Sequence, residues 1–106
     1  DDTGINKYVR EEERTIPFTN MIYIGDGYTD VPCMKLVKAN GGHSIAVYQP
    51  GSPTKKEIAE KLIQENRVNF IASADYSAGK PLEKMVFVII DKIYADTIVN
   101  KLKPKI

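Results

Sequence analysis

Two aspartates, Asp26 and Asp30, stand four residues apart in the segment MIYIGDGYTDVP, which covers residues 21–32. The segment opens with apolar, partly β-branched residues that are typical of a strand. Two carboxylates at the start of a helix are costly to hold together unless a positive group lies between them. Mg²⁺ takes one or two protein carboxylates and completes its shell with water and substrate phosphate. The spacing therefore predicts one Mg²⁺ site with Asp26 and Asp30 as its protein ligands.

The residues around these acids allow a bound phosphate as well as a simpler interpretation. Gly25 and Gly27 let the backbone approach a phosphate closely, and the helix that follows directs amides and positive dipole toward an anion. Alternatively, Asp30 only caps that helix and the two glycines only shape a tight turn. The stretch GDGYTD lacks the third glycine of a dinucleotide-binding fingerprint, so that class of site is not indicated.

The acids need a framework of strands and helices to position them, and the chain after Pro17 supplies one. Three predicted strands alternate with three predicted helices, which indicates parallel strands joined by right-handed crossovers. We read the strands at 21–27, 43–48 and 68–74, and the helices at 29–42, 55–65 and 82–101. The expected fold is therefore α/β, a partial three-layer Rossmann-like parallel sheet. Ligands of such sheets bind outside the carboxyl ends of the strands, where Asp26 and Asp30 lie.

Local signals predict how these elements begin and end. The first strand is expected to be buried on both faces, because its residues are almost all apolar. Gly41 and Gly42 are expected to stop the first helix with positive φ angles. Thr54 and Glu57 have the spacing of a capping box at the start of the second helix.

The segment MIYIGDGYTDVPCMKLVKANGGHSIAVY, residues 21–48, resembles the last conserved segment of the haloacid dehalogenase superfamily. Phosphatases of that superfamily end a strand with a Gly-Asp-Gly-x-x-Asp type motif that holds Mg²⁺. The resemblance implies that Asp26 is a direct metal ligand and Asp30 a second ligand, bound directly or through water. Thr29 stands where many relatives have Asn. Lys7 is the best match to the family's catalytic lysine, although a solvated surface lysine is an equally good interpretation.

The family's nucleophile is not found in this sequence. Its members attack phosphate with an aspartate of an Asp-x-Asp motif on the first strand and hold the phosphate with a Ser or Thr from the next. We therefore expect residues 1–17 to be an irregular arm and residues 18–106 to be the C-terminal, metal-binding half of a phosphatase-like domain, inactive alone. Its partners would be the missing half or a second copy, and a phosphorylated small molecule in the complete enzyme. The alternative is a noncatalytic α/β module that binds an ion or anion.

The composition of the chain bears on which partners and which cellular location are expected. Fifteen basic and fourteen acidic residues among 106 give a net charge of +1, which does not suit a nucleic-acid binder. No apolar run approaches the roughly 20 residues of a membrane span. Cys33 is the only cysteine, so an internal disulfide is excluded and a cytoplasmic location is expected.

Three further residues have side chains that could do chemistry. His43 begins the second strand with no acid nearby in sequence, and we expect a structural or surface role for it. Cys33 is expected to be a small packed residue rather than a nucleophile. Asp75 follows the third strand at the sheet end where the other acids lie, but a role in its own turn is favoured.

Overall fold

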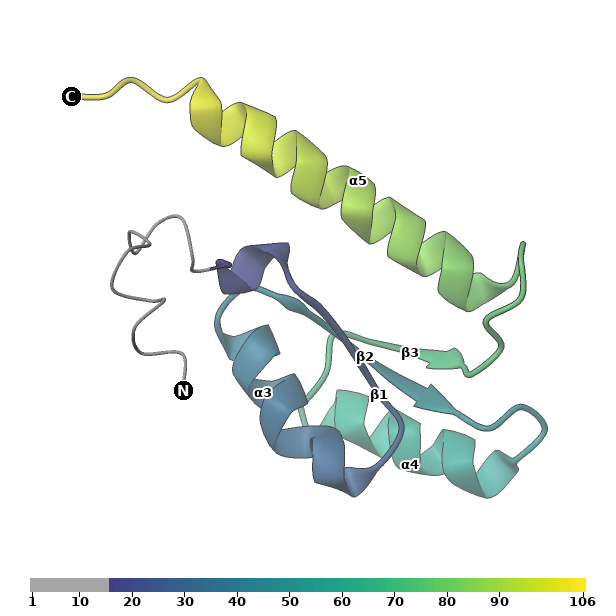
Figure 1. Cartoon of the computed structure of the whole chain (residues 1–106). Coiled ribbons are helices and arrows are strands. Elements are labelled where there is room, and N and C mark those ends of the chain that lie inside the picture. Colours follow the sequence, from purple (N-terminus) through teal and green to yellow (C-terminus); the bar gives the residue numbers. More distant parts are fainter. Residues whose placement is uncertain (1–15) are drawn as a thin grey trace, which may run out of the picture.

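The computed structural model describes residues 16–106, and within them the chain is an α/β fold, as predicted (Figure 1). The elements, in order, are the 3-10 helix η1 (Phe18–Asn20), β1 (Ile22–Gly25), the 3-10 helix η2 (Tyr28–Asp30), α3 (Val31–Ala39), β2 (His43–Tyr48), α4 (Pro53–Gln64), β3 (Phe70–Ser73) and α5 (Pro81–Lys101). Lys7 and most of the expected N-terminal arm lie outside the described residues.

The three strands form one parallel sheet in the order β1-β2-β3. Ile22 is aligned with His43 and Gly25 with Ala46, so the carboxyl ends of the strands meet at one edge. Figure 1 shows α3 and α4 on one face of the sheet and α5 on the other. This is the three-layer arrangement expected for two right-handed crossovers followed by a helix that returns over the opposite face.

Each face of the sheet carries its own hydrophobic core. Under α3 and α4 the buried residues are Val31, Met34, Ala46, Ala59, Leu62 and Val68. Under α5 they are Ile45, Val47, Ala72, Leu82 and Ile89. β2 contributes to both cores because it is the central strand, and five of its six residues are buried.

The prediction that the first strand is buried on both faces was wrong. Only Gly25 of β1 is fully buried, and Ile24 is 38% exposed. The reason is its position, because within the described sheet β1 pairs with β2 on one side and is an edge strand. The sequence of β1 is as apolar as that of a central strand. Its side chains are nevertheless less buried than those of β2, because β1 lies at the edge of the described sheet.

The predicted stop of the first helix was right for one glycine and wrong for the other. Gly41 has a φ of 86° and Gly42 has no positive φ. The Gly41 N–H donates to the carbonyl of Lys38 at 3.1 Å and the Gly42 N–H to that of Val37 at 2.8 Å, which is a Schellman motif. Gly42 is required for space, since a Cβ there would lie 2.5 Å from the carbonyl oxygen of Phe18.

The predicted capping box of the second helix was also wrong. α4 begins at Pro53, and the hydroxyl of Ser52 accepts a hydrogen bond from the Lys55 N–H at 3.3 Å. Ser52 is therefore the N-cap, and Thr54 already lies inside the first turn. The sequence Ser-Pro-Thr offers two hydroxyls, and proline's preference for the first helical position selects the earlier one.

We predict that Ser52→Ala lowers the free energy of unfolding by about 1 kcal/mol, because an orphan amide of α4 loses its acceptor. Thr54→Ala is the matched control and should change it by less than about 0.5 kcal/mol. Denaturant unfolding of both variants measures the difference. A larger loss in Thr54→Ala than in Ser52→Ala would contradict this assignment of the cap.

Candidate functional site

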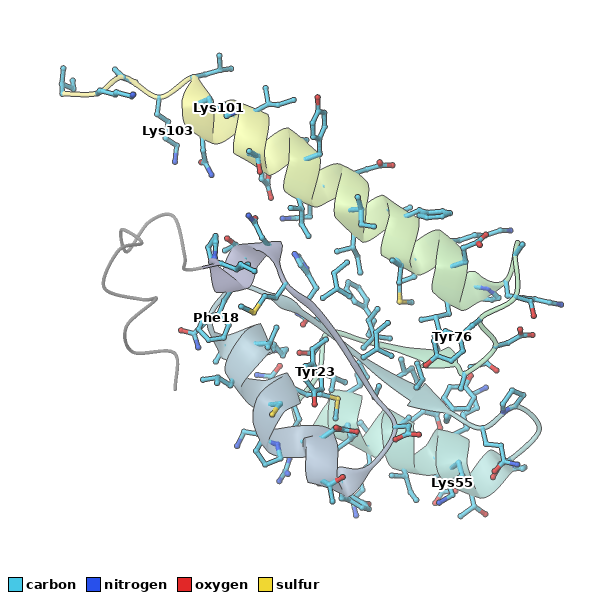
Figure 2. All side chains as sticks on the ribbon, in the orientation of Figure 1. Phe18, Tyr23, Lys55, Tyr76, Lys101 and Lys103 are labelled. Carbon is cyan, nitrogen blue, oxygen red and sulfur yellow. The ribbon has the colours of Figure 1, made fainter. Side chains whose placement is uncertain are left out.

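The loop that follows β1 is organised around the carboxylate of Asp30, which folds back onto the end of the strand. Its Oδ1 accepts a hydrogen bond from the Tyr23 hydroxyl at 2.9 Å, and its Oδ2 accepts one from the backbone N–H of Asp26 at 3.1 Å. Figure 2 labels Tyr23, which lies between β1 and α3. The two acids are thus linked through side chain and backbone, and the loop between them is closed.

Gly25 makes this closure possible because it has no side chain. A Cβ at Gly25 would lie 2.6 Å from the Cβ and 2.8 Å from the Cγ of Asp30. Nothing lies within 4 Å of a Cβ built at Gly27, so the second glycine is not required for space. The motif therefore uses its first glycine to seat the second aspartate.

The interpretation of Asp30 as a simple helix cap is wrong as far as its side chain is concerned. Asp30 occupies the position before α3, but its carboxylate makes no capping hydrogen bond. The helix instead starts through the 3-10 turn η2, whose Asp30 N–H donates to the Gly27 carbonyl at 3.0 Å. The carboxylate does not cap the helix because its oxygens accept hydrogen bonds from Tyr23 and from the Asp26 amide instead.

The hydrogen bond to Asp30 raises the pKa of Tyr23 from 10.0 to about 12, with burial adding to the effect. The carboxylate accepts from the neutral phenol and would repel a phenolate. Because the pKa in the folded protein lies above the ordinary value, the stability from this bond is present below pH 10.0 and lost as pH rises through about 12. At neutral pH the bond is fully formed.

A cleft of about 520 Å³ opens at the carboxyl edge of the sheet beside this loop. Its walls come from four elements, namely the loop at 25–28, the end of β2 at 46–50, the α4 residues Lys55, Ile58, Ala59 and Leu62, and Ala74 after β3. Asp26 is exposed and lines the cleft. Lys55, which Figure 2 labels near the start of α4, also lines it. The cleft thus combines an acid, a base and a largely apolar floor.

Asp26 and Asp30 are the two carboxylates of this loop that could ligate a divalent cation. Between Ile16 and Ile106 no group of three or more His, Cys, Asp or Glu side chains comes together. Asp26 lines the cleft. Both carboxylate oxygens of Asp30 already accept hydrogen bonds, so only their remaining lone pairs could bind a cation. A site with only two protein carboxylates would leave most of the shell of a bound cation to water.

The structure gives Asp75 and His43 local roles. The Oδ1 of Asp75 accepts from the N–H of Ser77 at 3.0 Å and from its hydroxyl at 2.5 Å, and these bonds lower the pKa of Asp75. Asp75 does not line the cleft, so its expected turn role is confirmed.

His43 is buried under α5, where burial and then nearby Lys92 lower its pKa. Its neutral form is favoured, and the resulting stability is lost as pH falls below about 6.5.

The described part of the chain also bears on two further expectations, a packed Cys33 and the lack of a membrane span. Cys33 is a free, exposed thiol, so the expectation of a packed residue was wrong. It lies in the first turn of α3, close enough to the Tyr23 hydroxyl to contribute to the raised pKa of that phenol. Among residues 16–106, no helix combines the length and the apolar character that crossing a membrane requires.

Sequence reasoning missed two residues of this region, Tyr23 and Lys55. Tyr23 precedes Asp30 by seven residues and was read only as part of an apolar strand. Lys55 reaches the cleft because α4 begins at the carboxyl end of β2, next to the end of β1. The expected parallel order of the strands could have predicted that Lys55, at the start of α4, lies near the end of β1. No pattern in the sequence predicts a hydrogen bond between a strand tyrosine and a loop aspartate.

Comparison with known proteins finds one significant curated relative. The chain is 37% identical over 81 residues to an uncharacterized protein of Borreliella burgdorferi. The match covers 74% of this chain and 27% of the relative, so the chain spans about a quarter of that protein's length. No family model and no solved structure matches the chain.

We predict that Gly25→Ala lowers the free energy of unfolding by about 1–3 kcal/mol, because the new methyl group forces the Asp30 side chain out of its seat. Gly27→Ala is the matched control and should be neutral or stabilising by less than about 1 kcal/mol, since the space there is open. Urea unfolding compares the two. Equal effects at both positions would show that Asp30 does not sit against Gly25.

Proposed function

We propose that this chain is the metal-binding part of a Mg²⁺-dependent phosphohydrolase that resembles the haloacid dehalogenase superfamily. The observation that carries the proposal is the placement of Asp26, exposed at the carboxyl end of β1 and facing the cleft, with Asp30 bonded to its amide. In parallel α/β sheets this is the edge where ligands bind. The chain is inactive alone, because it lacks the nucleophilic aspartate of that superfamily.

The donor set of the loop fits Mg²⁺. Asp26 would be the direct protein ligand and Asp30 a second one, with water and substrate phosphate completing the shell. When bound, the ion would neutralise charge on a phosphoryl group during its transfer. Asp30 holds the loop closed through the Asp26 amide, so the Asp26 carboxylate keeps its place at the edge of the cleft.

Other residues of the cleft favour a phosphorylated small molecule as substrate. The ammonium group of Lys55 supplies a positive charge for phosphate. Ile58, Ala59 and Leu62 give the cleft an apolar floor for the remainder of such a molecule. Because Cys33 is the only cysteine, we place this activity in the cytoplasm.

The missing catalytic part would pair with the edge of β1 that no strand of the described residues occupies. The His43 N–H donates to the Met21 carbonyl at 3.0 Å, and Ile22 is aligned with His43. In a parallel ladder this alternation turns the N–H groups of Ile22 and Ile24 away from β2. A strand carrying the nucleophile would find its hydrogen-bond partners there, beside Asp26, and Lys7 of this chain would serve the same phosphoryl group.

A second function is favoured by one observation, which is that both oxygens of Asp30 accept hydrogen bonds within the loop. In that case the loop is a noncatalytic ion- or anion-binding feature of an interaction module. Adding the remaining part of the B. burgdorferi protein distinguishes the two. Hydrolysis of an aryl phosphate that needs Mg²⁺ and is lost in Asp26→Asn supports the phosphohydrolase, and ion binding without hydrolysis supports the module.

We predict that Mg²⁺ binds the isolated chain weakly and shifts amide resonances at residues 25–31, because only two carboxylates contribute. Asp26→Asn should abolish the shifts. Asp75→Asn is the matched control, an acid at the same sheet edge that is bonded in its own turn, and should leave them unchanged. Shifts centred elsewhere, or unchanged in Asp26→Asn, would refute the site.

A further inference from the structure

The outer side of α5 is apolar although nothing in the described structure covers it. The residues on this side are Phe87, Ile90, Tyr94, Ile98 and Leu102, all between 42% and 77% exposed. They follow one another at spacings of three and four, which places them along one side of the helix. We call them the outer stripe. An exposed apolar patch of this kind marks an interaction surface.

The outer stripe is distinct from the side of α5 that covers the sheet. Leu82 and Ile89 face the sheet and are buried. Ile98 lies nine residues after Ile89, which at 3.6 residues per turn is two and a half turns, so it points the opposite way. A helix that is apolar on both sides is normally buried on both sides. Figure 1 shows α5 as the outermost layer of the molecule, so its outer side faces away from the fold.

Two charges within this region are arranged for self-complementary pairing. Asp91 lies between Ile90 and Tyr94 on the outer side of α5, and Lys101 lies ten residues later near the end of the helix, where Figure 2 labels it. When two copies of α5 run antiparallel with Asp91 opposite Lys101, Ile90 falls opposite Leu102. The same register sets Tyr94 opposite Ile98 and forms the Asp91–Lys101 pair twice.

We propose that the outer stripe of α5 binds a second copy of this chain, forming a two-fold symmetric dimer through an antiparallel α5 pair. A two-fold interface requires a surface that is complementary to itself, and this register supplies both apolar contacts and opposite charges. Apolar side chains in the seam and charged pairs beside it are the usual composition of paired helices. In this register the two helices face each other from Ile90 to Leu102, so the contact extends over about 20 Å.

This proposal is independent of the phosphohydrolase, since neither the cleft nor its acids take part. It also differs from pairing through the β1 edge. A dimer through β1 would involve the amides of Ile22 and Ile24, whereas a dimer through α5 does not involve them.

Light scattering over a concentration series tests the dimer, with the full chain as the sample. The wild type should pass from monomer to dimer, and Ile98→Asp should remain monomeric. Leu36→Asp is the matched control, an exposed helical apolar residue on α3, and should dimerise normally. A wild type that stays monomeric at all concentrations overturns the proposal. So does a dimer that survives Ile98→Asp and disappears in Ile24→Lys, which would locate the contact at β1.

Charge reversal tests the register without changing the apolar seam. Asp91→Lys and Lys101→Asp should each weaken the dimer roughly tenfold, because each places like charges together twice. Mixing these two variants should restore dimerisation as a heterodimer, since every pair is then of opposite sign, and the double variant should dimerise like the wild type. Failure of both the mixture and the double variant to recover would overturn the antiparallel register.

Discussion

The hydrogen bonds of the Asp30 carboxylate are the interaction on which the candidate site depends. One oxygen accepts from Tyr23 and the other from the amide of Asp26, so a single side chain connects the strand, the loop and the start of α3. The connection needs a position without a side chain at the end of β1, because a Cβ at Gly25 would lie 2.6 Å from that of Asp30. The glycine and the second aspartate of the motif are therefore one structural unit.

This unit determines where Asp26 lies. The parallel register brings the ends of the strands to one edge, and the closed loop keeps Asp26 at that edge beside the cleft. The two acids consequently have unequal positions, since Asp26 opens on the cleft and Asp30 is engaged inside the loop. In our proposal this inequality separates a direct ligand from a supporting one. In the same proposal, a further strand would pair with β1, which is an edge strand in the described sheet.

The alternation of elements was predictable because apolar runs and helical spacing are local properties, and each strand and helix lies where the pattern placed it. The burial of β1 was not predictable from its sequence, because burial depends on how many neighbouring strands β1 has in the sheet. The cap of α4 was misjudged because Ser52 and Thr54 both carry suitable hydroxyls. Asp26 was placed at the sheet edge by chain order alone. The Tyr23–Asp30 bond joins two elements through side-chain reach, which no spacing rule encodes.

The ionisation of Tyr23 tests most directly whether the Asp30 carboxylate organises the loop. Carbon NMR of the tyrosine rings, assigned with Tyr23→Phe, follows this phenol through alkaline pH. We expect a midpoint at about 12 in the wild type and a return toward 10.0 in Asp30→Asn, because the charged acceptor is then absent. A wild-type midpoint at 10.0, unchanged by Asp30→Asn, would contradict the account.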